Sequence, residues 1–95
     1  MGLTEIKIIN KVPTYSTFEN GSTVYFAIRN ELANGNNIVL SFEGIAGVPS
    51  SFVNGLFNKL IEEIGIDGIK QRIRITHSTR MINDMLKRKF ALAAN

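Results

Sequence analysis

The chain has 95 residues, of which 44% are apolar and 20% charged, and it carries a formal charge of +3 and no cysteine. We expect one folded globular domain over residues 1–95, and disulfides, thiolate metal sites and cysteine nucleophiles are excluded. The sequence shows neither the pattern of a signal peptide nor an apolar run close to the about 20 residues that span a bilayer. A cytoplasmic location without membrane contact is therefore expected.

The first half of the chain predicts a strand, a helix and a second strand. Residues 3–9 alternate apolar and polar or charged side chains, as a half-buried strand does. A loop around Pro13 follows, and residues 21–33 have the apolar spacing of a helix with Ser22 as its N-cap. Residues 38–42 are almost continuously apolar, which indicates a central strand covered on both faces.

The second half predicts a helix, an edge strand and a last helix. Residues 50–64 form a strongly amphipathic helix, and Gly65 fits the position just past its end. Residues 71–76 alternate again, with one charged face that favours a place near the sheet edge. Ser78 is expected to cap a helix over residues 79–92. The apolar side chains of this helix that are expected to face inward are Met81, Ile82, Met85, Leu86 and Phe90.

This alternation of strands and helices favours an α/β domain with a mostly parallel sheet and about three helices. In such a sheet the loops after the strands meet at one edge, where ligands of open α/β sheets bind. The loops in question span residues 10–21, 43–51 and 77–80. Topology therefore makes candidate neighbours of five polar residues in the last two loops: Ser50, Ser51, His77, Ser78 and Arg80.

The adjacent residues Ser50 and Ser51 stand where a strand-to-helix loop ends, and two interpretations are open. A serine oxygen can cap the helix by accepting a hydrogen bond from a free amide of the first turn. Alternatively, the helix N-terminus stabilises negative charge by roughly 0.3–1 kcal/mol, so the pair could accept or contact a phosphate. No Walker loop or nucleophile elbow accompanies the pair.

Other chemistry-bearing residues favour binding over catalysis. His77 is the only histidine and has no spaced cluster of metal ligands around it, so we predict no metal and no cofactor. No carboxylate stands out that would orient a serine–histidine pair, and we predict that the protein is not an enzyme. The last helix is basic, but it lacks the interleaved aromatic residues of single-strand binders, so nucleic-acid binding is not expected.

The segment IVLSFEGIAGVPSSFVNGLFNKL and the later strand RIRIT resemble the STAS-like domain family, small bacterial and phage proteins akin to anti-sigma factor antagonists. The resemblance implies that Ser50 is the serine phosphorylated by an ATPase-type kinase, and that phosphorylation switches partner binding. The chain departs from the family pattern at three positions. Pro49 replaces an aspartate before the serines, Phe52 replaces a glycine after them, and Ser41 stands where the central strand often has an aspartate.

The leading functional prediction is a regulatory protein–protein interaction module, with a protein partner such as an ATPase-type kinase or a host regulatory or immune protein. Ser50 and Ser51 are the candidate phosphoacceptor or anion-contact residues. The residues expected to form the docking surface are Gly44, Gly47, Pro49, Phe52, Ser78 and Arg80. The alternative is a phage or mobile-element inhibitor that occludes a host protein such as an immune-system nuclease. A homodimer is compatible with either prediction, since a chain this short buries a modest core.

Overall fold

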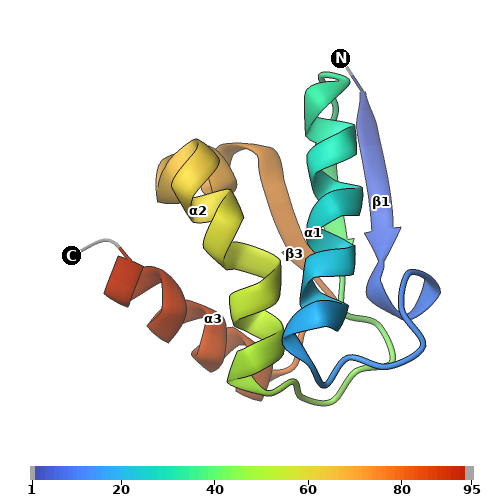
Figure 1. Ribbon diagram of the computed structural model, residues 1–95, viewed down its shortest axis with the longest axis vertical. Helices are drawn as coiled ribbons and strands as arrows, with labels where there is room; N and C mark the ends of the chain where they lie inside the picture. The colour runs from blue at the N-terminus through green and yellow to red at the C-terminus, as the bar shows by residue number, and fades with distance from the viewer. Residues whose placement is uncertain (1, 94–95) are drawn as a thin grey trace.

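The computed structural model describes residues 2–93 as a three-stranded parallel sheet with three α-helices (Figure 1). The strands lie in the order β1-β2-β3, and each neighbouring pair is parallel. This confirms the predicted α/β fold. The elements in chain order are β1 (Leu3–Lys7), the 3-10 turn η1 (Ile8–Asn10), α1 (Phe18–Ala33), β2 (Asn37–Ser41), α2 (Ser50–Arg72), β3 (Ile73–Thr76) and α3 (Arg80–Ala93).

Helices α1 and α2 cover the same face of the sheet. The chain steps from β1 to β2 to β3 in one direction, and right-handed crossovers then place both connecting helices on one side. Figure 1 shows both helices in front of the strands, whereas α3 packs against α2. The covered face carries buried Ile6, Ile38, Leu40 and Ile73. No helix within residues 2–93 is long and apolar enough to cross a bilayer.

The closest contact between α1 and α2 is made by two glycines. A Cβ atom built on Gly21 would overlap the carbonyl oxygen of Phe52 and lie 2.8 Å from the amide nitrogen of Leu56. A Cβ atom on Gly55 would overlap the carbonyl oxygen of Phe18. The two backbones therefore touch near their first turns, and this contact holds the beginnings of both helices at the same edge of the sheet.

Helix α1 begins earlier than predicted, and Ser22 is not its N-cap. The N-cap is Thr17, whose hydroxyl oxygen accepts from the Asn20 amide at 3.0 Å, while the Asn20 side-chain oxygen accepts from the Thr17 amide at 3.3 Å. This reciprocal capping box satisfies two free amides, so the helix starts at Phe18 and Ser22 lies inside it.

The helical stretch that begins at Ser50 breaks at Gly65, as predicted, but a further helical segment follows within α2, and β3 is shorter than predicted. Gly65 does interrupt the helical path, with φ of 71°, but helical structure resumes after it and continues to Arg72. The Arg72 guanidinium donates to the carbonyl oxygens of Leu32 at 3.2 Å and Asn36 at 3.0 Å, which ties the end of α2 to the end of α1. The predicted strand over residues 71–76 therefore begins at Ile73.

Helix α3 differs from its prediction at both its cap and one apolar residue. The Ile82 amide donates to the hydroxyl oxygen of Thr79 at 3.3 Å, while Ser78, the predicted cap, donates to Asn83 at 2.6 Å. Ile82 is buried as predicted, and so is Leu86, with Met85 and Phe90 partly buried. Met81 is 66% exposed, so its predicted inward orientation is wrong.

We predict that Gly21→Ala and Gly55→Ala each lower the free energy of unfolding by about 3 kcal/mol, because the added methyl group meets backbone atoms that cannot rotate away. Ser22→Ala is the matched control, since the Ser22 backbone flanks the crossing point but the substitution adds no atom there. Chemical denaturation measures the difference. Equal stability of the three variants would contradict the role given to the glycine contact.

Candidate functional site

Three loops meet at the carboxyl ends of the strands, as the topology predicts. The Ser51 hydroxyl donates to the carbonyl oxygen of Ser16 at 3.3 Å, which joins the loop before α1 to the start of α2. The Thr79 hydroxyl donates to the carbonyl oxygen of Ala46 at 2.7 Å, which joins the loop after β2 to the start of α3. We call this area the carboxyl-edge surface. The exposed residues that define it here are Ile9, Gly44, Pro49, Ser50, Ser51, Arg80 and Met81, and they are not the only exposed residues of these loops.

Ser50 and Ser51 are the first two residues of α2, and both are exposed. The N-cap is Pro49, which has no side-chain acceptor, so the interpretation of either serine as the helix cap is wrong. The Ser51 hydroxyl is engaged with Ser16. No hydrogen bond of the Ser50 hydroxyl occurs among the described residues, which makes Ser50 the more available hydroxyl of the pair.

Ser50 lines a groove of about 220 Å³ between α2 and α3. Apolar side chains of Val53, Met85 and Leu92 line it, and its polar residues besides Ser50 are Asn54, Arg88 and Lys89. Lys89 donates to Asn54 at 2.9 Å and also to Asn58. Arg88 is exposed and forms no ion pair within residues 2–93. The groove, called the Ser50 groove below, therefore combines an apolar lining with one cation that is free to meet an anion.

Two exposed apolar side chains lie beside the glycines of the loop after β2. A Cβ atom on Gly44 would lie 3.6 Å from Ile9, and one on Gly47 would lie 2.9 Å from the sulfur of Met81. Ile9 is 42% exposed and Met81 is 66% exposed. Neither residue was predicted as a surface feature, and Met81 in particular follows the helical spacing of core residues. The small glycines let these side chains lie against the loop while staying open to solvent.

Phe52 does not belong to the docking surface that the sequence predicts. Its side chain is fully buried in the core, because the first turn of α2 lies against α1 at Gly21. Ser78 is half-buried and Arg80 is exposed, but no described hydrogen bond joins either of them to Ser50 or Ser51. These two residues reach the carboxyl-edge surface through their position beside Thr79.

His77 pairs with Ser41 and not with the exposed serines. Its backbone has a φ of 54°, and its Nδ1 lies 3.3 Å from the Ser41 hydroxyl oxygen and 3.3 Å from that of Thr76. Ser41 is fully buried and accepts a hydrogen bond from the Glu43 amide at 3.2 Å. The contact thus ties the end of β2 to the end of β3. Among residues 2–93, no group of three metal-ligating side chains is found.

A protein-family model matches about two thirds of the chain. The model of the family described as a STAS-like domain of unknown function (DUF4325) matches residues 20–83. The matched range contains most of α1, the loop after β2, the paired serines, His77 and the first turn of α3. No curated protein and no solved structure matches the chain.

Thr79 is expected to hold the carboxyl-edge surface together, because its hydroxyl both donates to Ala46 and accepts from Ile82. We predict that Thr79→Ala lowers the free energy of unfolding by about 1–2 kcal/mol, as loss of a helix cap does. Thr79→Ser, which retains the hydroxyl, should lose less than half of that. Thermal unfolding followed by circular dichroism measures both variants, and identical melting curves for Thr79→Ala and the parent protein would refute the assignment.

Proposed function

The chain belongs to the STAS-like domain family, and from this premise we propose that it is a regulatory protein–protein interaction module that docks through its carboxyl-edge surface. One observation carries the proposal: exposed Ser50 lines a groove with apolar walls, and exposed Met81 of α3 lies against Gly47 in the loop that leads to Ser50. Exposed apolar side chains beside polar ones at the ligand-binding edge of a parallel sheet are what a protein interface requires.

Ser50 is the proposed control point of this surface. A phosphate there adds about −1.5 to −2 charge at the N-terminus of α2, where the helix dipole favours an anion. Arg88 lines the same groove and is free of ion pairs within the described residues. A phosphate on Ser50 would occupy the Ser50 groove and attract Arg88, and it would thereby compete with a partner side chain for the same groove. The proposal is that phosphorylation releases a partner that inserts an acidic or apolar side chain into this groove.

The identity of the partner separates this proposal from its alternative. An ATPase-type kinase is the partner that the regulatory module needs. A phage or mobile-element inhibitor would instead bind a host protein such as an immune-system nuclease, through the same surface and without any need for Ser50. Capture from host lysate followed by mass spectrometry distinguishes the two: recovery of a nuclease without a kinase favours the inhibitor.

Phosphorylation is tested by incubating the protein with its ATPase-type kinase and ATP and measuring intact mass. We predict the addition of one phosphate, its loss in Ser50→Ala, and its retention in Ser51→Ala, because the Ser51 hydroxyl is held by Ser16. An unmodified parent protein, together with unchanged partner binding in Ser50→Asp, would refute the switch while leaving the docking surface to be tested separately.

Docking is tested by substituting the exposed apolar side chain next to the loop glycines. We predict that Met81→Asp weakens partner binding by more than about tenfold, since a buried charge at an interface is costly. Phe26→Asp is the matched control, because Phe26 is 47% exposed in the middle of α1, away from the carboxyl edge. Isothermal titration calorimetry of each variant with the captured partner gives the two dissociation constants. Equal losses in both variants would contradict the proposed surface.

A further inference from the structure

Within residues 2–93, the face of the sheet opposite α1 and α2 is open at its centre and toward the amino ends of the strands, whereas Ser41 at its carboxyl end is fully buried. Leu3 is 70% exposed, Glu5 and Arg74 are exposed, and Val39 at the centre of the face is half-buried. Parallel sheets are almost always covered on both faces. An uncovered parallel face with apolar residues therefore indicates a surface that a second body covers.

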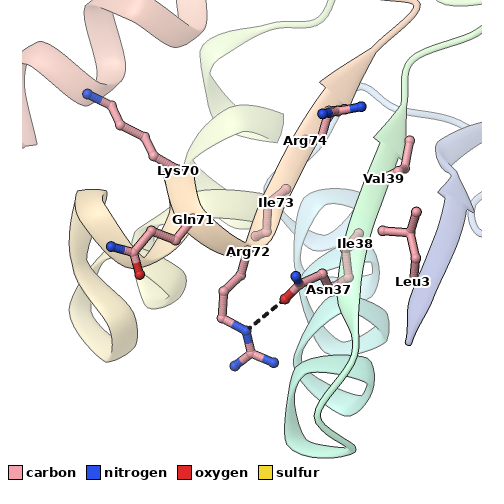
Figure 2. Close-up of a pocket in the computed structure, with 9 residues that line it drawn as sticks. All are labelled: Leu3, Asn37, Ile38, Val39, Lys70, Gln71, Arg72, Ile73 and Arg74. Atoms are coloured by element: carbon pink, nitrogen blue, oxygen red, sulfur yellow. Dashed lines mark hydrogen bonds between the residues drawn. The ribbon is translucent and has the colours of Figure 1, made fainter. Parts of the chain in front are cut away.

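The charges on this face form an ordered row across the three strands. The register pairs Glu5 with Val39 and Val39 with Arg74, so an anion, an apolar residue and a cation stand side by side. Figure 2 shows Leu3, Val39 and Arg74 on the three neighbouring strands, in front of the layer that holds α1. Toward the amino ends of the strands, this face has a hollow with a volume of about 370 Å³. We call the row of Glu5, Val39 and Arg74 the central row.

We propose that the open face binds the same face of a second copy, with a twofold axis that runs parallel to the strands and passes beside Val39. This operation places Val39 against Val39 and brings Glu5 of each copy opposite Arg74 of the other. A twofold axis across the strands would instead set Glu5 against Glu5 and Arg74 against Arg74. The charge pattern thus selects one of the two ways in which the faces can stack, and the resulting contact is self-complementary as a twofold interface must be.

Both charged residues of the central row are available for this contact. Neither Glu5 nor Arg74 forms an ion pair within the described part of the chain, whereas Lys7 on the same face is already 3.4 Å from Glu43. A strongly acidic helix from another protein fits less well, because it would meet the like charge of Glu5. The basic helix α3 of a second copy would likewise meet the like charge of Arg74.

The size of the face sets the expected strength of the dimer. Three strands of at most five residues, about 4.8 Å apart, make a contact below the roughly 1,200 Å² of a standard interface. Contacts of this size are typical of weak, transient complexes, so we expect a dissociation constant on the order of 0.1 mM. Added salt should raise it, because salt screens the ion pairs between Glu5 and Arg74. Since the axis runs along the strands, both carboxyl edges point the same way. If those edges are the docking surfaces proposed above, the dimer presents two of them at one end, and a bivalent partner gains avidity.

The test is sedimentation equilibrium of the whole chain from about 10 µM to 1 mM at low salt, a range that spans the expected dissociation constant. Glu5→Arg and Arg74→Glu should each raise the dissociation constant at least about tenfold, because each creates two like-charge contacts. The double variant restores opposite charges and should return to within about threefold of the parent protein. Partner binding through the carboxyl edge is unaffected by these changes, so failure here is distinct from failure of the proposed function.

Charge reversals elsewhere provide the controls. Glu62→Arg on α2 and Lys87→Glu on α3 alter exposed residues outside the open face and should leave the dissociation constant unchanged. Circular dichroism verifies that each variant is folded. If the protein stays monomeric at concentrations up to about 1 mM, the proposal is overturned, and a different protein becomes the candidate that covers this face. Absence of rescue in the double variant, or equal weakening by the control reversals, would overturn it as well.

Discussion

The backbones of α1 and α2 touch where Gly21 meets the first turn of α2 and Gly55 meets the first turn of α1. Side chains at these positions would force the helices apart, so the two glycines set how closely the crossover helices cover the sheet. The same contact buries Phe52 and brings Ser51 within hydrogen-bond distance of Ser16. The next residue toward the N-terminus, Ser50, is thereby left at the surface beside the groove. Accessibility of the candidate control residue thus follows from a packing contact that does not involve it.

The second constraint is the strand order, because an all-parallel β1-β2-β3 sheet places both crossover helices on one face. The domain is left with a carboxyl edge built from three loops and with an uncovered face built from alternate strand residues. The first surface lies at the ends of the strands and the second on their broad face, so the proposed partner and the proposed second copy would contact different residues. Arg88, one of several cations on α3, lines the Ser50 groove, which adjoins the first surface at Ser50, whereas Arg74 on β3 belongs to the second surface.

Much of the fold was predictable from the sequence, since apolar spacing alone indicates the strands and helices and their alternation implies the parallel sheet. The family resemblance was predictable as well, from the strand, glycine turn and paired serines, and the match over residues 20–83 confirms it. Details that depend on tertiary contacts were not predictable from the sequence. The start of α1 depends on a reciprocal hydrogen bond between Thr17 and Asn20, and the burial of Phe52 depends on a distant glycine. Exposure of Met81 depends on the loop at Gly47 that it packs against, which periodicity within one helix does not reveal.

Partners are proposed to bind at the carboxyl edge of the sheet, with Ser50 inside the contact. Hydrogen–deuterium exchange of the protein with and without its captured partner tests this most directly, because it reports on the backbone of every loop in one experiment. Binding at this edge predicts slower exchange in residues 43–51 and 77–82, and unchanged exchange in the middle of α1. Protection confined to α1, or absent from residues 43–51, would contradict it.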